Sequence, residues 1–301
     1  MRKRRRGAGW VLALLLAGIG CEDLPEGRPP LRERALAEGE PGLPGSPEAK
    51  IVVVSVDGLR PDAIEMAPAP SLLALTRRGA YSWRARTVDM SLTLPSHAAM
   101  VSGFLPSEHK LTHNDLRPGY IAVPTVMSTA REAGKRVVIV VGKDKLIQLL
   151  PPQSFDVFVW APATDDEVID RAIEEVGAGF DLMFVHLPHV DHVGHSLGWM
   201  SAAYLEQVAR TDAAVGRLAA ALPPEATLLV TADHGGTGYI HWSGAPEDLH
   251  IPWIAVGPGI HPARELIQPI STVDTAATAA FVLGLTLDPA AVGRAVLEPW
   301  Q

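Results

Sequence analysis

The stretch "IVVVSVDG" at residues 51–58 is the clearest indication of how this chain folds. Five of its first six residues are β-branched aliphatics, and the run ends abruptly in Asp57 and Gly58. A continuous apolar run is typical of a strand buried on both faces of a parallel sheet, because a half-exposed strand would alternate. The strand would place a carboxylate at its carboxyl end, where such sheets bind their ligands.

The same pattern recurs along the chain and alternates with helical segments. Further strands are predicted in "RVVIVVG" (136–142), "DVFVW" (156–160), "DLMFVHL" (181–187), "ATLLVTADHG" (226–235) and "IPWIAVG" (251–257). Helices are predicted at 69–80, 123–134, 164–177, 201–222 and 271–285, with Ser, Thr, Asp or Pro near their starts. This alternation predicts an α/β fold: a doubly wound, mostly parallel central sheet with helices on both faces.

The composition favours a folded, acidic domain. Of the 301 residues, 47% are hydrophobic and 20% charged, which excludes a disordered chain. The first 20 residues hold five of the 26 basic residues and no acidic one, so the remainder carries 21 basic against 34 acidic residues, or −13. A domain this acidic is poorly suited to a nucleic-acid backbone, and no such partner is expected.

The N-terminus reads as a targeting segment. "MRKRRR" precedes the apolar run "WVLALLLAGIG", and Cys21 follows directly. Cys21 is the sole cysteine, which excludes an intramolecular disulfide, and its setting resembles the lipidation site of a bacterial lipoprotein, although Gly18 stands where Leu is usual. A simple signal peptide or membrane anchor is the alternative. We therefore expect a signal or lipoprotein segment at 1–21, membrane attachment through it, and a bacterial envelope location, periplasmic or at the cell surface.

A Pro-, Gly- and Glu-rich stretch at 22–49 predicts an extended, solvated linker. The folded catalytic domain is then expected to occupy residues 50–301.

Three predicted strands deliver carboxylates and imidazoles to one edge of the sheet. The first ends in Asp57, the strand at 181–187 leads into Asp191 and His195, and the strand at 226–235 ends in Asp233 and His234. Taken singly, each has a structural reading as a turn or a helix cap. Together they offer oxygen and nitrogen ligands without a thiolate, which suits Zn²⁺ in a hydrolytic site, with Mn²⁺ or a similar ion as the alternative.

Four motifs together resemble the alkaline phosphatase superfamily, and within it the type I phosphodiesterase/nucleotide pyrophosphatase branch. They are "VDG" (56–58), "SLTLPSHAAMVSG" (91–103), "VDHVGH" (190–195) and "TADHGG" (231–236). The similarity extends from residue 51 to about residue 285. It implies a phosphoric ester hydrolase with a two-zinc site on a doubly wound α/β sheet.

The resemblance also implies a role for each ligand. Asp57, Asp233 and His234 would hold one zinc ion, with the Thr93 hydroxyl bound to it as the nucleophile. Asp191 and His195 would hold the other, together with a third histidine late in the chain. His241 is favoured over His250 for that role because it lies a few residues before the "PED" and "IPW" segments; Trp242, where many relatives have Gly, is a departure.

A threonine hydroxyl has too high a pKa to attack phosphorus unaided, so the resemblance and the chemistry agree on a metal that activates Thr93. Ser91 and Ser96 are rival hydroxyls in the same segment. Asn114 matches the amide that binds a transition-state oxygen in the family, although "HND" also reads as a simple turn. The sulfatase branch is disfavoured, because His97 stands where its Arg would be.

Two lysines leave the substrate class open. Lys143 and Lys145, in "VGKDKLIQLL" (141–150), resemble a segment with which some threonine-nucleophile phosphatases and phosphonoacetate hydrolases neutralise a second negative charge; the alternative is a solvated loop. We expect a phosphodiesterase or nucleotide pyrophosphatase acting on a small phosphate ester or nucleotide. A phosphomonoesterase, a phosphonoacetate hydrolase-like enzyme and a noncatalytic metal-binding surface lipoprotein are the alternatives. Trp199 and Tyr239 could offer a surface to a nucleobase or pack in the core.

Overall fold

The computed structural model describes residues 42–301. The predicted targeting segment at 1–21, with Cys21, and most of the predicted linker lie outside the described residues. Residues 42–49, the last part of that linker, lie against the domain: Gly42 packs on Glu225, and the Gly45 N–H donates to the Val282 carbonyl at 2.9 Å. Within the described range, no helix is long and apolar enough to cross a bilayer.

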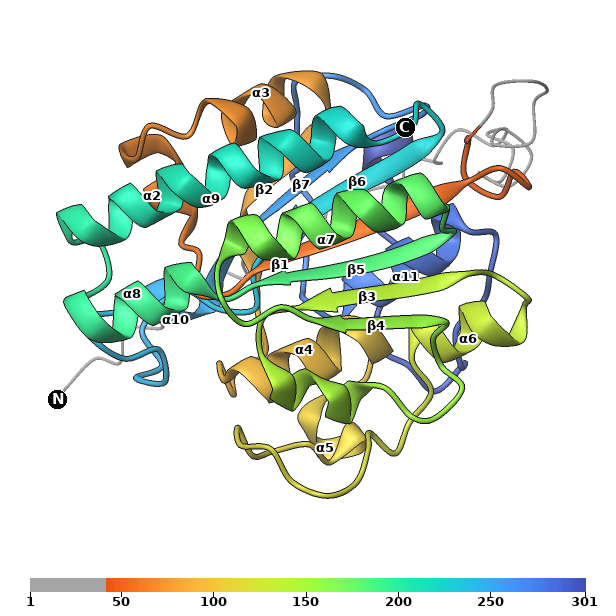
Figure 1. The fold of residues 1–301 in the computed structure, drawn as a ribbon, viewed down its shortest axis with the longest axis horizontal. Coiled ribbons are helices and arrows are strands. Elements are labelled where there is room, and N and C mark those ends of the chain that lie inside the picture. The colour runs from red at the N-terminus through yellow and green to blue at the C-terminus, as the bar shows by residue number, and fades with distance from the viewer. Residues whose placement is uncertain (1–41) are drawn as a thin grey trace, which may run out of the picture.

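One sheet of eight strands forms the centre of the domain (Figure 1). Its order is β4 (Val157–Trp160), β3 (Val137–Val141), β5 (Leu182–Leu187), β1 (Lys50–Val56), β6 (Ala226–Thr231), β7 (His250–Val256), β2 (Ala80–Arg86) and β8 (Arg264–Glu265). β7 runs antiparallel to both of its neighbours, and the other pairings are parallel. The predicted mostly parallel α/β fold is confirmed.

Helices cover both faces of this sheet (Figure 1). On one face lie α3 (Pro70–Arg78), α7 (Asp165–Ala178) and α9 (Ala202–Ala221), with α2 (Pro61–Met66) and α8 (His189–Leu197) beside α9. On the other lie α4 (Thr93–Ser102), α5 (Pro106–His109), α6 (Val126–Glu132) and α11 (Asp274–Val282). The short α10 (Pro246–Leu249) precedes β7, and 3-10 turns occupy Asp144–Leu149 and Glu298–Trp300.

This two-sided covering explains the composition of the strands. Every residue of β3, β5 and β6 is buried, as is every residue of β1 after Lys50, which matches their nearly continuous apolar runs. The sequence did not predict β2, because Arg84 and Arg86 are exposed on it and interrupt its apolar pattern. β1 pairs with both β5 and β6, so the carboxyl ends of these three strands lie side by side.

Candidate active site

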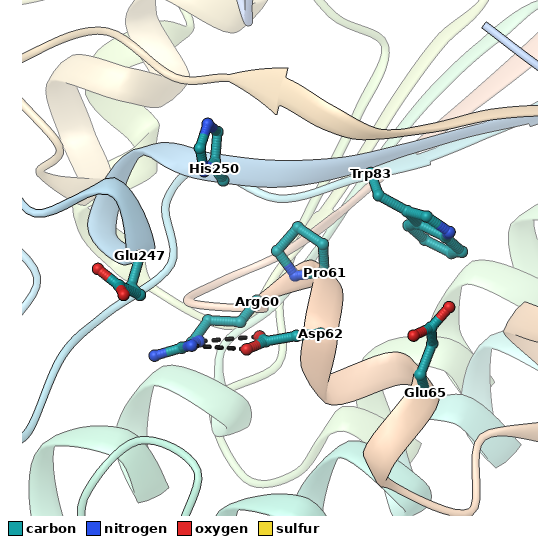
Figure 2. Close-up of a pocket in the computed structure, with 7 residues that line it drawn as sticks. All are labelled: Arg60, Pro61, Asp62, Glu65, Trp83, Glu247 and His250. Atoms are coloured by element: carbon teal, nitrogen blue, oxygen red, sulfur yellow. Dashed lines mark hydrogen bonds and ion pairs between the residues drawn. The ribbon is translucent and has the colours of Figure 1, made fainter.

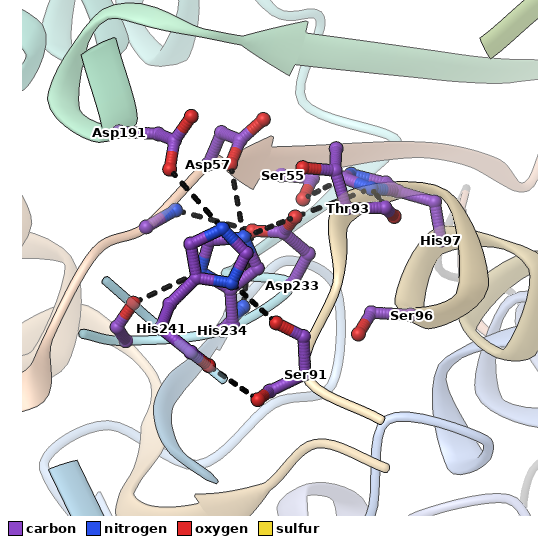
Figure 3. A network of polar contacts seen from close by, with 12 residues as sticks. Ser55, Asp57, Ser91, Thr93, Ser96, His97, Asp191, Asp233, His234 and His241 are labelled. Atoms are coloured by element: carbon purple, nitrogen blue, oxygen red, sulfur yellow. Dashed lines mark hydrogen bonds and ion pairs between the residues drawn. The ribbon is translucent and has the colours of Figure 1, made fainter. Parts of the chain in front are cut away.

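An inner cluster forms where β1 and β6 end. Asp57 follows β1 directly, and Asp233 and His234 follow β6; all three side chains are fully buried. The His234 Nε2 atom lies 3.3 Å from Asp57 Oδ1 and 3.3 Å from Asp233 Oδ2 (Figure 3). Gly58 adopts a positive φ of 73°, and its N–H donates to Asp233 Oδ1 at 3.1 Å, which joins the two strand ends.

An outer cluster lies beside it, on α8 and on the loop after β6. Asp191 and His195 are one helical turn apart, and His195 Nε2 lies 3.3 Å from Asp191 Oδ1. His241 Nε2 lies 4.0 Å from the same oxygen. The His241 ring also stacks on His234, with 3.7 Å between ring centroids and 8° between planes, so it links the two clusters (Figure 3).

The three candidate histidine ligands share one hydrogen-bonding arrangement. Their Nδ1 atoms donate to backbone carbonyls: His234 to Gly235 at 2.9 Å, His195 to Tyr239 at 2.9 Å and His241 to Ser91 at 2.5 Å. Each Nε2 lone pair is therefore left to face the carboxylates. This is the arrangement by which proteins orient a metal-binding imidazole.

Buried polar atoms without a partner test whether a cation fits here. Among the described residues, Asp57 Oδ1, Asp191 Oδ1, Asp233 Oδ2 and His234 Nε2 are buried and have no hydrogen-bond partner. Leaving such groups unpaired is costly, and native proteins rarely do so without a functional reason. Two sets of residues are close enough to share one ion each, Asp57 with Asp191 and His234, and Asp191 with His195 and His241. The donor atoms therefore fit divalent cations.

Lys143 occupies a position that the sequence did not predict. Its Nζ atom donates to Asp57 Oδ2 at 2.6 Å and to Asp191 Oδ2 at 2.7 Å. Lys143 thus binds the Oδ2 atom of each carboxylate. The Oδ1 atoms of Asp57 and Asp191, which have no hydrogen-bond partner, are not used by the lysine. Its predicted contact with substrate stays a prediction.

These charges shift the pKa values of the carboxyl groups. Burial raises the pKa of Asp57, but the Lys143 ammonium and the His186 hydrogen bond outweigh burial and hold it well below its ordinary value. For Asp191, burial and the Asp57 charge raise the pKa, and Lys143 and His195 lower it by more. Burial, followed by the Asp57 charge, raises the pKa of Asp233.

The histidine pKa values separate His195 from the other two candidate ligands. Burial lowers the pKa of His234, and burial together with the neighbouring His234 lowers the pKa of His241 to about 3. The Asp191 carboxylate, 3.3 Å from Nε2, raises the pKa of His195, which is only partly buried. At neutral pH, His234 and His241 are therefore neutral imidazoles, the form that binds a metal.

Two buried histidines support the inner cluster, and sequence reasoning did not name either as a site residue. His186 Nε2 lies 2.9 Å from Asp57 Oδ2. His97 donates from Nδ1 to the Thr93 carbonyl at 2.7 Å and accepts from the Ser55 hydroxyl at 2.8 Å. A histidine inside an otherwise apolar strand, as His186 is in β5, needs a buried partner, and that could have identified it.

Thr93 is the first residue of α4 and lies beside the inner cluster (Figure 3). The rival hydroxyls are engaged elsewhere: Ser91 donates to the His241 carbonyl, and Ser96 donates to Met90 and accepts from Thr87. Within residues 42–301, the Thr93 hydroxyl has no hydrogen bond. It is therefore the hydroxyl left available in this segment.

Asn114 lies at the same helix start. Its Oδ1 atom accepts from the Leu94 N–H at 2.9 Å and from Lys145 Nζ at 2.9 Å. Burial, followed by the Lys143 charge, lowers the pKa of Lys145. The structure thus brings Asn114 and Lys145 together beside Thr93.

His250 lies apart from these ligands, whereas Trp199 packs against two of them, with its ring centroid 5.0 Å from that of His195 and 5.9 Å from that of His241. His250 is exposed at the start of β7 and lines a separate pocket of about 290 Å³ with Arg60, Trp83 and Glu247 (Figure 2). Trp199 is buried, and its Nε1 atom donates to the Gly58 carbonyl at 2.9 Å, so it packs in the core.

The fold places the chain in the alkaline phosphatase-like class. The chain belongs to the type I phosphodiesterase/nucleotide pyrophosphatase family, which matches residues 51–242. The predicted family is confirmed, and with it the class of enzyme, the phosphoester hydrolases and transferases of this superfamily.

Relatives agree with this placement. The human GPI ethanolamine phosphate transferase 2 catalytic subunit is 26% identical over 281 residues, which are 83% of this chain and 28% of that protein. The phosphopentomutase of Deinococcus radiodurans is 32% identical over 181 residues, 58% of this chain and 44% of the mutase. The chain thus spans less than half the length of these relatives. Murine ectonucleotide pyrophosphatase/phosphodiesterase 5, solved as an inactive Thr-to-Ala variant in complex with AMP, superposes with a TM-score of 0.69 at 15% identity, covering 83% of this chain and 98% of that one.

Proposed function

We propose that the chain is a metal-dependent hydrolase of phosphoric esters, of the phosphodiesterase/nucleotide pyrophosphatase type, with Thr93 as its nucleophile and two zinc ions as cofactors. One observation carries the proposal: unpartnered, buried carboxylate and imidazole atoms converge beside an available hydroxyl at a helix start. The inactive Thr-to-Ala variant of the murine pyrophosphatase/phosphodiesterase supports a threonine in this role.

Asp57 and His234 would hold one cation together with Asp233, whose unpartnered Oδ2 atom lies 3.3 Å from His234 Nε2. Asp191, His195 and His241 would hold the other. Cations there would supply positive charge that lowers the pKa of a hydroxyl or water and offsets the charge of the phosphoryl group. Zinc is the proposed ion because the donor set combines imidazoles and carboxylates.

The chain's own residues carry the remaining steps. The Thr93 oxygen attacks phosphorus and forms a P–O bond as the ester oxygen leaves with a proton. Because Asn114 Oδ1 is occupied by Leu94 and Lys145, its amide NH₂ group is the part free to donate to a phosphoryl oxygen. Water then attacks the phosphothreonine, the new P–O bond breaks, and Thr93 regains its proton.

Lys145 favours a second candidate, a phosphomonoesterase or phosphonoacetate hydrolase-like enzyme. Its ammonium touches the amide that would bind a phosphoryl oxygen, so it is placed to neutralise a second negative charge. A phosphate monoester or a carboxylate carries that extra charge, and a diester does not. The family match, in contrast, supports the diester.

A paired assay on the full chain with zinc tests both candidates. We expect turnover of bis-p-nitrophenyl phosphate above that of p-nitrophenyl phosphate, and loss of turnover with a chelator or with Thr93→Ala. Ser96→Ala is the matched control and should remain active. Preference for the monoester would favour the second candidate. Zinc binding without turnover, or turnover that survives Thr93→Ala, would contradict the proposal.

The N-terminal segment is proposed to export and anchor the protein through Cys21. Labelled palmitate should enter the wild-type protein in bacterial cells and not the Cys21→Ala variant. Absence of label from both, with the protein in the cytoplasm, would contradict this.

A further inference from the structure

Two exposed aromatic side chains flank the outer cluster. Trp242 and Tyr239 are 55% and 61% exposed, although both lie beside residues that are nearly buried. The Trp242 ring centroid lies 5.0 Å from that of His241 and 5.9 Å from that of His195. The Tyr239 carbonyl accepts the His195 hydrogen bond, and its ring lies against the backbone of Gly198.

The fold does not require these rings at the surface. The large aromatic side chains that stabilise the core, Trp253, Tyr204 and Trp199, are buried. Trp242 instead meets the His241 ring edge-on at 80°, so a fixed contact holds its indole beside the site and leaves much of it open to solvent. A rigid, exposed indole is a stacking surface.

Charge is distributed unevenly across the site. Lys145 lies beside Asn114 and Lys143 lies between Asp57 and Asp191, whereas Trp242 and Tyr239 border His195 and His241. In Figure 3, Thr93 lies to one side of Asp57, and Asp191 and His241 lie to the other. In an in-line displacement, the leaving oxygen departs on the side opposite the nucleophile, which is the side of the outer cluster.

We propose that Trp242 and Tyr239 form a leaving-group subsite that selects esters of planar aromatic alcohols. The subsite rests on the proposed function, because it assigns the leaving side from Thr93. A flat ring stacks on the indole face, whereas an alkyl chain gains only its smaller contact area. The phosphoryl group that is transferred would lie between this subsite and Thr93.

The test compares 2-naphthyl and phenyl esters of the same phosphoryl group, because their alcohols have similar acidity and differ mainly in ring area. The full, zinc-loaded chain should favour the naphthyl ester in kcat/KM, and Trp242→Ala should reduce that preference by roughly tenfold. Trp242→Phe should restore much of it, and Tyr239→Ala should show a smaller reduction. Trp160→Ala removes an equally exposed tryptophan at the end of β4 and should leave the preference unchanged.

A binding measurement separates this subsite from the proposed function. Calorimetry with 2-naphthylphosphonate and phenylphosphonate needs no turnover, and the naphthyl compound should bind more tightly to wild type but not to Trp242→Ala. If wild type turns over esters yet shows no naphthyl preference in kinetics or binding, the subsite is wrong and the proposed function stands. If the naphthyl compound binds through Trp242 but the protein turns over no ester, the proposed hydrolase activity is wrong and the aromatic binding site stands. If Trp242→Ala instead abolishes binding to anionic vesicles and leaves both preferences intact, the surface faces a membrane and the subsite is overturned.

Discussion

The inner and outer clusters are built from the same residue types but differ in their foundations. Asp57, Asp233 and His234 extend from the ends of two adjacent central strands and are fully buried. Asp191, His195 and His241 extend from a helix and a loop, and the His195 side chain is 34% exposed. The inner cluster is therefore fixed by the sheet itself, whereas the outer cluster depends on how α8 and the loop pack.

The supporting contacts repeat this difference. The inner cluster is braced by His186 from β5, within the sheet. The outer cluster is supported indirectly, through the start of α8. Asp165, at the start of α7, accepts from the His189 N–H at 3.2 Å and lies 3.0 Å from the His189 ring. Asp165 also accepts from the Thr211 hydroxyl on α9. Contacts among three helices thus support the start of α8, which carries Asp191, whereas His186 supports Asp57 from within the sheet.

The largest expected effect comes from removing one ligand of each cluster. Asp233→Asn should lower kcat/KM by roughly 10³-fold or more, because a buried ligand cannot be replaced by water at the nucleophile's cation. His195→Gln should lower it less, by roughly 10²-fold, because water can reach this partly exposed position. Steady-state kinetics with zinc content measured on each variant checks both values. Equal losses at equal zinc content would refute the proposed difference between the clusters.

Lys143 joins the clusters, so its removal tests their coupling. Lys143→Met should lower the free energy of unfolding of the metal-free protein by about 3–5 kcal/mol, because the buried Asp57 and Asp191 carboxylates then lose the ammonium group between them. Added zinc should recover most of that loss. Urea unfolding with and without zinc measures both, and the exposed Lys110→Met is the control. A loss that zinc does not restore would mean that the ammonium does not share its site with a cation.

The sequence predicted the inner cluster more completely than its surroundings. Asp57, Asp233 and His234 follow apolar runs, and the carboxyl ends of parallel strands must meet at one edge, so their proximity follows from the pattern alone. The fold and family predictions are confirmed by the observed sheet and by the family match. The ligand roles stay predictions.

What the sequence could not predict depends on side-chain direction and packing. Lys143 follows a strand end like any loop lysine, and only the order β3, β5, β1 brings its ammonium between two carboxylates. The position of His241 requires the loop after β6 to fold back onto Ser91, a contact between residues 150 apart in the chain. The sequence did not predict β2, which lies next to the edge strand β8, because its exposed arginines interrupt the apolar pattern of a strand.

Smaller changes in zinc affinity are expected when the residues that support each cluster, His186 and Asp165, are replaced. His186→Ala should weaken zinc binding by roughly 10- to 100-fold, because the outer-shell hydrogen bond that orients Asp57 is lost. Asp165→Asn should weaken the binding of the second zinc equivalent by a smaller factor, since it acts through the start of α8. Competition with a chromophoric chelator resolves the two equivalents. If Asp165→Asn weakens the first equivalent instead, the inner cluster is not the tighter site.

The smallest expected effect concerns the fold outside both clusters. His109, at the end of α5, is buried, and burial lowers its pKa from 6.5 to about 4. Between these values the unfolded chain binds a proton that the folded chain does not, so stability is complete above pH 6.5 and falls as the pH is lowered. The loss between pH 7 and pH 5.5 should be about 1 kcal/mol. His109→Gln, which keeps an acceptor for the Leu111 N–H, should flatten this slope in urea unfolding, whereas the exposed His261→Gln should not. An unchanged slope in His109→Gln would assign the acid sensitivity to the two clusters, where protonation competes with the cation, rather than to the packing of α5.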